Sequence, residues 1–323
     1  MQLTERKVNM SLPLQAIQAR CSRILNDLND NACAYGIEVS SMPCGAKLMD
    51  AGINATGSYQ AGALVTELCQ GGLASASIRP QNLGKLLLPH IFVETYIPRC
   101  ANLVLQSARP FEGEMISGPI KMFLENDAPD PAECSTALTA VLQCDKFPSD
   151  EWTVSLAKAA GCEPAQLTLV AVPQGSAAGS TQIAGRMNEN MLFTMENSLG
   201  YDSSMVRHIL GYCPIGPYGP APEGKHLLLP DDYLHYASGA CLTIDAPEGL
   251  DIQKLADDLA FNSLSIYGKL FYELLEQAGW DFFKIPDVMH INKLAEVTIC
   301  DIRSGKTAVA GCKDTEILTN QLV

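Results

Sequence analysis

The chain has 323 residues, of which 47% are hydrophobic and 18% charged, a composition typical of folded globular proteins with one large domain or two smaller ones. Its net charge of −14 and pI near 4.7 argue against a nucleic-acid partner, which needs a basic face. The sequence has no signal-peptide core and no apolar run near the roughly 18 residues of a membrane span, so we expect a cytoplasmic protein without a membrane segment.

The cysteine and histidine spacings do not indicate a metal site. The twelve cysteines include no Cys-x-x-Cys pair, the spacing typical of zinc and iron–sulfur ligands. Several cysteines lie in apolar runs, where a reduced thiol acts as a small hydrophobic side chain. The five histidines are dispersed and show no ligand spacing. They are His90, His208, His226, His235 and His290.

The first third of the chain predicts helices and short strands in alternation. Apolar residues recur at helical spacing over residues 11–28, which predicts an amphipathic helix. Short strands are expected in residues 36–42 and 46–52. Residues 57–78 then give a glycine loop, a helix, a stop at Gly71 and Gly72, and another strand. This order favours an α/β fold.

Two later blocks repeat this pattern. The first predicts a strand in residues 135–144, a helix in 150–161, a strand in 167–172 and a long helix over about 180–199; the second spans residues 238–302. Residues 127–133 and 211–225 are rich in proline and have no helical periodicity, which predicts connections.

The most informative stretch is "AVPQGSAAGSTQIAGRMNEN", residues 171–190, in which a strand leads through a glycine-rich loop into a helix. A buried stripe is predicted at Ile183, Met187, Met191 and Met195, with Arg186 and Glu189 three residues apart on its flank. The simpler interpretation is a surface ion pair. The functional alternative is a loop and helix N-terminus that favour anions, where Arg186 places a ligand and Glu189 handles a proton or a water.

Other glycine-rich stretches carry a weaker signal. Glycines crowd around Asp50 and Glu67, and Ser117, Gly118 and Pro119 follow an expected strand. The simpler reading is that these glycines permit a positive φ or close packing.

Several motifs, in order, make the chain resemble the methenyltetrahydromethanopterin cyclohydrolases of methanogens and of bacteria that oxidise one-carbon compounds. The likeness covers most of the chain. Its motifs are "DAG" at Asp50, "GSYQAG", "ELCQGGLA", "VAVPQGSAAGSTQIAGRMNE", "GYCPIGP", "SIYGKLFYELLEQAGWDFFKI" and "DIRSGKTAVAG".

The resemblance implies an enzyme that reversibly hydrolyses 5,10-methenyltetrahydromethanopterin, whose five-membered ring is cationic, to the 5-formyl derivative without metal or redox cofactor. A bacterial host would use it in formaldehyde oxidation. The resemblance places the catalytic pair on Arg186 and Glu189. The residues that it suggests for substrate binding are Asp50, Glu67, Gly71, Gly72, Ser117, Gly118, Pro119, Ser180, Gln182 and Pro214.

The same resemblance implies a cyclohydrolase-type α/β fold with two α/β layers flanking a deep pterin-binding cleft, assembled as a homotrimer. Residues 1–323 would form one unit of two interwoven subdomains, roughly 1–130 and 131–323.

The chain departs from the family pattern at several positions. Lys121 in "ISGPIK" replaces an arginine, which loses bidentate geometry. The family's asparagine–aspartate pair is Asp231–Asp232 here, Leu270 replaces a proline, and "MHINKLAE" replaces another family segment. These departures leave two alternatives open: a non-catalytic paralogue that binds a reduced pterin, or a scaffold subunit. The retained Arg186 and Glu189 favour the enzyme.

Overall fold

Two mixed β-sheets with helices between and around them make up the fold in the computed structural model, which describes residues 14–108, 115–124, 137–217 and 227–323. This confirms the α/β class. The five-stranded sheet has the order β1 (Glu38–Ser41), β2 (Lys47–Asp50), β7 (Leu167–Val172), β6 (Leu138–Gln143), β5 (Met115–Ser117). The six-stranded sheet has the order β11 (Thr307–Gly311), β10 (Glu296–Asp301), β9 (Gly239–Ile244), β8 (Val206–Pro214), β4 (Leu86–Thr95), β3 (Ala74–Leu83).

The chain passes between the two sheets several times. Strands β1 and β2 belong to the five-stranded sheet, β3 and β4 to the six-stranded sheet, β5 to β7 to the five-stranded sheet again, and β8 to β11 to the six-stranded one. Each sheet is therefore assembled from segments far apart in the sequence. The expected subdomain boundary near residue 130 lies outside the described residues, and that division stays a prediction.

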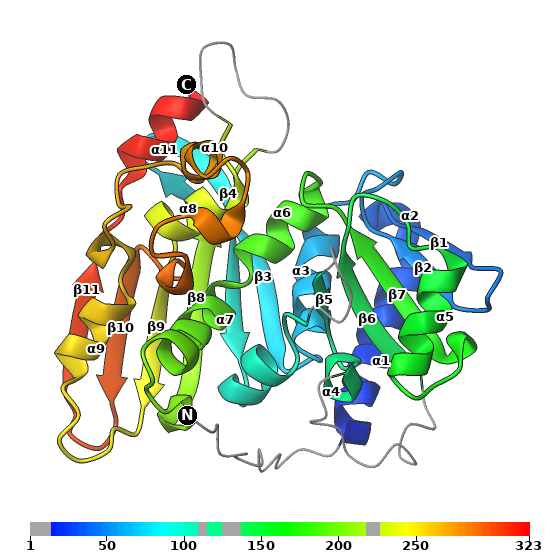
Figure 1. The fold of residues 1–323 in the computed structure, drawn as a ribbon, viewed down its shortest axis with the longest axis horizontal. Helices are drawn as coiled ribbons and strands as arrows, with labels where there is room; N and C mark the ends of the chain where they lie inside the picture. The colour runs from blue at the N-terminus through cyan, green and yellow to red at the C-terminus, as the bar shows by residue number, and fades with distance from the viewer. Residues whose placement is uncertain (1–13, 109–114, 125–136, 218–226) are drawn as a thin grey trace.

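The helices lie between the sheets and on their faces (Figure 1). They are α1 (Leu14–Asp30), α2 (Ala32–Tyr35), α3 (Tyr59–Cys69), α4 (Lys121–Leu124), α5 (Asp150–Ala159), α6 (Ala177–Ala184), α7 (Met187–Phe193), α8 (Pro230–Ala237), α9 (Ile252–Leu259), α10 (Phe271–Gln277) and α11 (Thr315–Leu322). Short 3₁₀ or π turns are η1 (Cys100–Val104), η3 (Pro164–Gln166), η4 (Thr194–Ser198), η5 (Ser203–Met205), η6 (Phe261–Ser263), η7 (Phe282–Lys284) and η8 (Val288–His290). Helices α3 and α6 lie between the sheets, and α5 lies on the outer side of the five-stranded one.

Strand β7 shows why the apolar run at residues 167–172 is continuous. All six of its residues are buried, because both faces of this central strand are covered. Val170 and Val172 face the core shared with α1 and α3, whereas Leu169 and Ala171 face the core closed by α5. The strand thereby holds the start of the following loop and α6 in a fixed position between the sheets.

Helices α3 and α6 approach each other closely where Gly62 has no side chain. A Cβ at Gly62 would lie 2.4 Å from the Cβ of Thr181 and 2.7 Å from the carbonyl oxygen of Ala178, both too short for real contacts. Glycine at this position therefore permits the close helix crossing.

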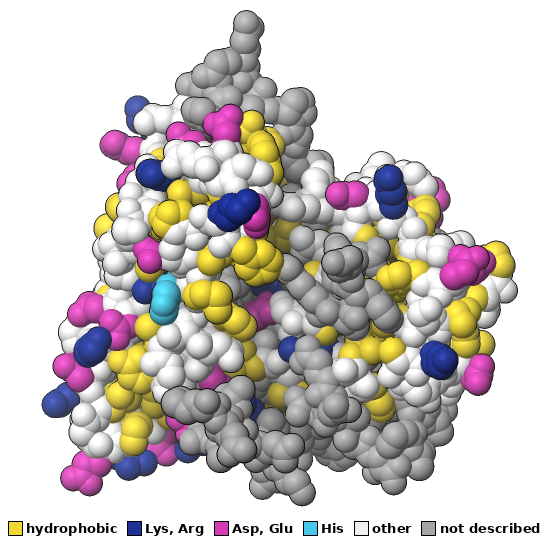
Figure 2. All heavy atoms as spheres, in the orientation of Figure 1, with side chains coloured by type: hydrophobic (Ala, Val, Ile, Leu, Met, Phe, Trp, Pro, Cys, Tyr) yellow, Lys and Arg dark blue, Asp and Glu magenta, His cyan; other side chains and the backbone are white. Residues whose placement is uncertain are grey.

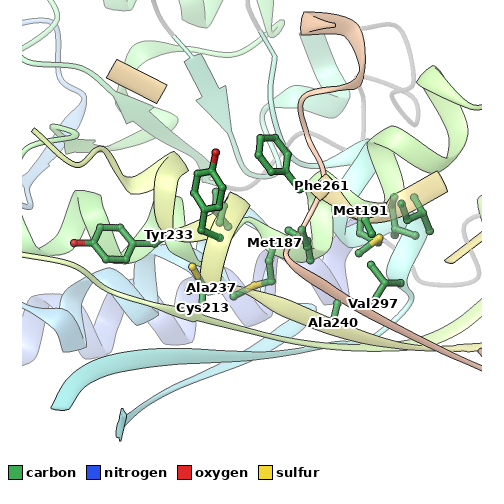
Figure 3. Close-up of a cluster of buried hydrophobic side chains, with 14 of the residues drawn as sticks. Met187, Met191, Cys213, Tyr233, Ala237, Ala240, Phe261 and Val297 are labelled. Atoms are coloured by element: carbon green, nitrogen blue, oxygen red, sulfur yellow. The ribbon is translucent and has the colours of Figure 1, made fainter. Parts of the chain in front are cut away.

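The predicted methionine stripe is confirmed. Ile183, Met187, Met191 and Met195 are all buried in the core that covers the six-stranded sheet. In Figure 3, Met187 and Met191 lie in a cluster of buried side chains together with Ala240 and Val297, which come from strands β9 and β10. The stripe fixes the rotation of α7 and so the direction in which its other faces point.

The predicted helix over residues 180–199 is wrong in one respect, because it is interrupted. Helix α6 ends at Ala184, α7 begins at Met187, and the π turn η4 follows α7. Between the helices, Arg186 has φ −86° and ψ 5°, outside regular helix geometry. A Cβ at Gly185 would lie 2.6 Å from the Thr66 side chain, so close packing against α3 accompanies the break.

The remaining predicted strands and connections agree with the structure to different extents. The strands expected in 36–42, 46–52, 135–144 and 167–172 are confirmed as β1, β2, β6 and β7. Strand β8 extends to Pro214 and takes up the start of the connection expected at 211–225, whose residues 218–225 lie outside the described part, as do 127–133 and 11–13. Strands β4 and β11 were not predicted.

Candidate active site

Arg186 and Glu189 form a buried ion pair at the start of α7. Arg186 is the residue before the helix and Glu189 lies in its first turn. Their relative exposures are only 8% and 5%, and Arg186 Nε donates to Glu189 Oε2 at 2.6 Å. The alternative of a surface ion pair is therefore wrong. Because isolated charges are costly to bury, the pair needs the further polar partners that surround it.

Two serines complete the hydrogen bonding of this pair. Arg186 Nη2 donates to Ser107 Oγ at 2.7 Å and to Ser117 Oγ at 3.0 Å. Ser107 Oγ in turn donates to Glu189 Oε1. The sulfur of Met115 accepts from Arg186 Nη1 at 3.2 Å. The guanidinium and the carboxylate are thus held in one orientation by groups from two other segments of the chain, Ser107 and strand β5.

Ser107 has an unusual backbone conformation. Its φ is +62°, a region that residues other than glycine occupy at a cost of roughly 1–3 kcal/mol. Its backbone N–H donates to Ser117 Oγ at 3.2 Å, so the two serines hold each other beside the ion pair. Strain of this kind often marks functional positions. The strained backbone conformation here places the Ser107 hydroxyl between the Arg186 guanidinium and the Glu189 carboxylate.

The electrostatics of the pair keep the arginine charged. Burial alone would lower the pKa of Arg186, but the charge of the adjacent Glu189 raises this pKa above its ordinary value. Burial raises the pKa of Cys69 to about 11, so that thiol is neutral at physiological pH.

A cavity of about 520 Å³ opens beside this pair, a volume in the range of small-molecule sites. Its wall combines β5 and β6 of the five-stranded sheet with helices that cover the six-stranded sheet. The lining residues are Ser107, Met115, Gln143, Gln174, Ile183, Arg186, Glu189, Asn190, Phe193, Asp231, Leu234, His235, Phe271, Phe282, Ile291 and Asn292. On the face shown in Figure 2, charged side chains are scattered over the outer parts and apolar ones gather toward the middle.

His235 on α8 belongs to this wall as a neutral ring. It stacks on Phe261 with centroids 4.1 Å apart and planes 3° from parallel. Burial lowers the pKa of His235 to about 3, against a hydrogen bond to the Ile291 backbone that raises it. His235 therefore adds an uncharged aromatic surface to the cavity.

A second cavity of about 380 Å³ shares Gln174 with the first. Ser180 and Pro214, both expected to bind substrate, lie in its wall. The hydroxyl of Ser180 donates to the Gln174 carbonyl at 3.3 Å. Gln182 lies just behind the first cavity, where its Nε2 donates to Gln143 Oε1 at 3.0 Å.

Asp50 and Glu67 are not brought to either cavity. The carboxylate of Asp50 accepts hydrogen bonds from four successive backbone N–H groups, residues 52–55, at 2.6–2.9 Å. Burial raises the pKa of Asp50, but these four bonds lower it below the ordinary value. Glu67 Oε1 accepts from Ala76 N at 2.7 Å. Asp50 thus organises the loop that follows β2, and Glu67 on α3 binds the backbone of β3.

The expected site residues Gly71, Gly72, Gly118 and Pro119 also lie away from the two cavities. Gly71 and Gly72 have φ of +62° and +69°, the conformation that ends helix α3. Gly118 has φ +100° and packs against the Thr139 carbonyl. Pro119 contributes a carbonyl that accepts from Met122 N at 3.2 Å. Among residues 117–119, Ser117 is the one that hydrogen-bonds to the ion pair, through Arg186 Nη2.

Ser107 and Asp231 are the site residues that sequence reasoning did not assign. Ser107 lies 79 residues before Arg186, in a stretch with no recognisable pattern, so nothing in the sequence indicated its contact. Asp231 was visible as a departure from the family pattern, a signal that could have pointed to the cavity.

Comparisons with known proteins show which family the chain belongs to. A family model described as Cyclohydrolase (MCH) matches residues 16–322. The chain belongs to this cyclohydrolase family. It is 30% identical over 315 residues to the methenyltetrahydromethanopterin cyclohydrolase of Methanothermobacter marburgensis, covering 94% of this chain and 98% of the relative. The enzyme of the same name from Methanococcus vannielii is 31% identical, with 93% and 95% covered, and that from Methanocaldococcus jannaschii is 30% identical, with 95% and 98% covered.

Within residues 14–108, 115–124, 137–217 and 227–323, no group of three His, Cys, Asp or Glu side chains is placed to hold a metal ion. In the same ranges no helix is long and apolar enough to cross a lipid bilayer.

Proposed function

We propose that this cyclohydrolase reversibly hydrolyses 5,10-methenyltetrahydromethanopterin to 5-formyltetrahydromethanopterin. The observation that supports this most strongly is the buried Arg186–Glu189 pair in the wall of a 520 Å³ cavity, in a chain whose relatives carry the name of this activity. The substrate carbon lies between two nitrogens in a cationic ring. Its hydrolysis needs a positioned water and groups that accept the protons of that water.

Glu189 is the base in this proposal. Among the described residues, Oε2 accepts from Arg186 and Oε1 from Ser107. A carboxylate has about four acceptor positions, so positions remain for a water that enters the cavity. Glu189 would accept a proton from this water while the water oxygen attacks the ring carbon.

Arg186 is a positioning residue. Its Nη2 bonds to both serines, which leaves Nε for Glu189. The guanidinium thereby fixes the direction in which the carboxylate points. Ser107 acts on the other oxygen in the same way.

We also propose that the reaction requires no metal and no redox cofactor, because the cationic ring is already electrophilic. The working form would be a cytoplasmic homotrimer, and a bacterial host would use it in formaldehyde oxidation. Analytical ultracentrifugation tests the assembly: a trimer mass is expected, and a monomer mass would contradict that part of the proposal.

A turnover assay tests the activity. Purified protein is incubated with methenyltetrahydromethanopterin, and the loss of its ultraviolet absorption is followed. Acceleration over buffer is expected for the wild type and for Glu151→Gln, which changes an exposed carboxylate on α5, but not for Glu189→Gln. Saturable binding of the pterin without turnover by the wild type would instead indicate a non-catalytic paralogue.

A further inference from the structure

Asp231 and Asp232 are adjacent carboxylates at the start of α8 with different surroundings. Asp232 is fully buried, and its oxygens accept from Leu229 N at 2.8 Å and from Phe271 N at 2.6 Å. Asp231 is partly exposed and lines the same cavity as Arg186. Asp232 therefore joins α8 to α10, whereas Asp231 faces the space available to a ligand.

The charged and titratable groups near Asp231 come from several elements. Arg186 precedes α7, Asp232 neighbours it on α8, Cys213 lies on β8, and the neutral His235 follows one turn later. Burial raises the pKa of Asp231 to about 6, although the charge of Arg186 opposes this shift. Burial also keeps the Cys213 thiol neutral by raising its pKa.

The proposed hydrolysis requires two proton acceptors. The attacking water loses both of its protons as its oxygen becomes the formyl oxygen. One proton ends on the ring nitrogen that leaves, and the other is released, because a cation and water give a neutral product and one proton. Glu189 can carry the first proton from the water to the nitrogen. The second needs another base.

We propose that Asp231 is the second proton acceptor of the hydrolysis and the proton donor of the reverse cyclisation. This inference rests on the proposed function. Water oxygen forms a bond to the ring carbon while Glu189 takes one proton. The carbon–nitrogen bond then breaks with return of that proton to nitrogen, and the remaining hydroxyl proton passes to Asp231 as the carbonyl forms.

The position of Asp231 suits this task. It lies on a different element from Glu189 but in the same wall, so a flat ring between them would be accessible to both carboxylates. Its negative charge also compensates the cationic ring, since Arg186 and Glu189 neutralise each other.

Asp231→Asn tests the inference in both directions of the reaction from pH 5 to 8.5. In the wild type, hydrolysis should rise and cyclisation fall as pH passes about 6, because hydrolysis needs the ionised form. The variant should lose this pH dependence, and its kcat should fall by about 10-fold or more. This fall is smaller than the roughly 100-fold loss on removing a typical positioned base, because water can substitute for Asp231. Asp231→Glu should restore part of the rate and the pH dependence.

Two readouts separate this role from a structural one. Because the pKa of Asp231 is higher in the folded than in the unfolded protein, this group contributes stability that is fully present below the unfolded pKa. That contribution is lost as the pH rises through about 6. Asp231→Asn should therefore raise Tm at pH 8, whereas loss of a structural contact would lower it. Infrared spectra of the wild type should show carboxyl bands titrating near pH 6 for Asp231 and near pH 7 for Asp232, and Asp231→Asn should lose the first of them.

The matched control is Asp257→Asn, which changes an exposed carboxylate on α9 and should leave rate, pH profile and Tm as in the wild type. An unchanged pH profile in folded Asp231→Asn, or a fall in its Tm together with the rate, would overturn the inference. If the wild type turns over no substrate at all, the proposed function fails instead.

Discussion

Two arginine–glutamate pairs lie near each other in this protein and differ in how the arginine holds the carboxylate. Arg186 and Glu189 have side chains only 9% and 7% exposed and are joined by a single 2.6 Å bond from Nε. Arg99 and Glu196 are 27% exposed, and Arg99 contacts both carboxylate oxygens, at 3.0 Å and 2.6 Å. The second pair connects η1 to η4, which are distant in sequence.

The difference indicates how tightly each carboxylate is held. A guanidinium that binds both oxygens favours the ionised form strongly. Burial would raise the pKa of Glu196, but Arg99 and Ser203 lower it below the ordinary value. Arg186 instead shares its donors between Glu189 and two serines. Glu189 lines the 520 Å³ cavity and Glu196 does not, so the first pair is placed for chemistry, whereas the Arg99–Glu196 pair holds two segments together.

The largest expected difference is between the two glutamates. Glu189→Gln should lower kcat of hydrolysis by about 10³-fold, because the amide cannot accept the proton of water. Glu196→Gln should keep kcat within about threefold, since its role is to connect two segments. Ultraviolet turnover assays on both variants measure this, and similar losses in the two would remove the functional distinction between the pairs.

The second-largest expected difference in kcat is between variants of the two arginines. Arg186→Lys should lower kcat by about 100-fold, because one ammonium cannot reproduce the bonds to Glu189, Ser107 and Ser117 and misplaces the base. Arg99→Lys should change kcat little. The assay is the same, with circular dichroism to verify folding. A fully active Arg186→Lys would contradict the positioning role.

Two variants of Ser107 distinguish the effect of its hydroxyl group from that of its backbone strain. Ser107→Ala and Ser107→Gly should both lower kcat by about 10-fold, since each removes the hydroxyl that contacts Glu189 and Arg186. The glycine variant should be more stable than the alanine variant by about 1 kcal/mol, because glycine adopts φ near +62° without strain. Urea unfolding measures this difference, and equal stabilities would exclude strain at this position.

The smallest effect concerns stability and pH. The lowered pKa of Glu196 means that its ion pair stabilises the fold above the unfolded pKa and loses this contribution as pH falls through the folded value. Glu196→Gln should therefore cost about 1 kcal/mol at pH 7, with the difference shrinking as the pH falls below about 4.5. A difference independent of pH would show that charge is not its source.

Part of the site could be predicted because its parts are close in the chain. Arg186 and Glu189 are three residues apart, and the methionine stripe beside them fixed which flank they occupy. The break between α6 and α7 has one indication in the sequence, Gly185, because a glycine within a helix weakens it. The contact with Thr66 that accompanies the break depends on tertiary packing.

The remaining site residues come from distant segments. Ser107 follows η1, and Asp231 begins α8, and only folding brings them to one cavity. Asp50 illustrates the opposite case: its glycine-rich surroundings resembled a binding loop, but the backbone of that loop itself uses the carboxylate. Sequence alone does not show which way a side chain points.

The most direct measurement is a crystal structure of Glu189→Gln with methenyltetrahydromethanopterin bound, since this variant should bind the substrate without consuming it. The cationic ring should occupy the 520 Å³ cavity, with its bridging carbon facing position 189 across one water molecule. A ring bound elsewhere, or a bridging carbon directed away from Arg186 and position 189, would contradict the assignment of this pair as the catalytic centre.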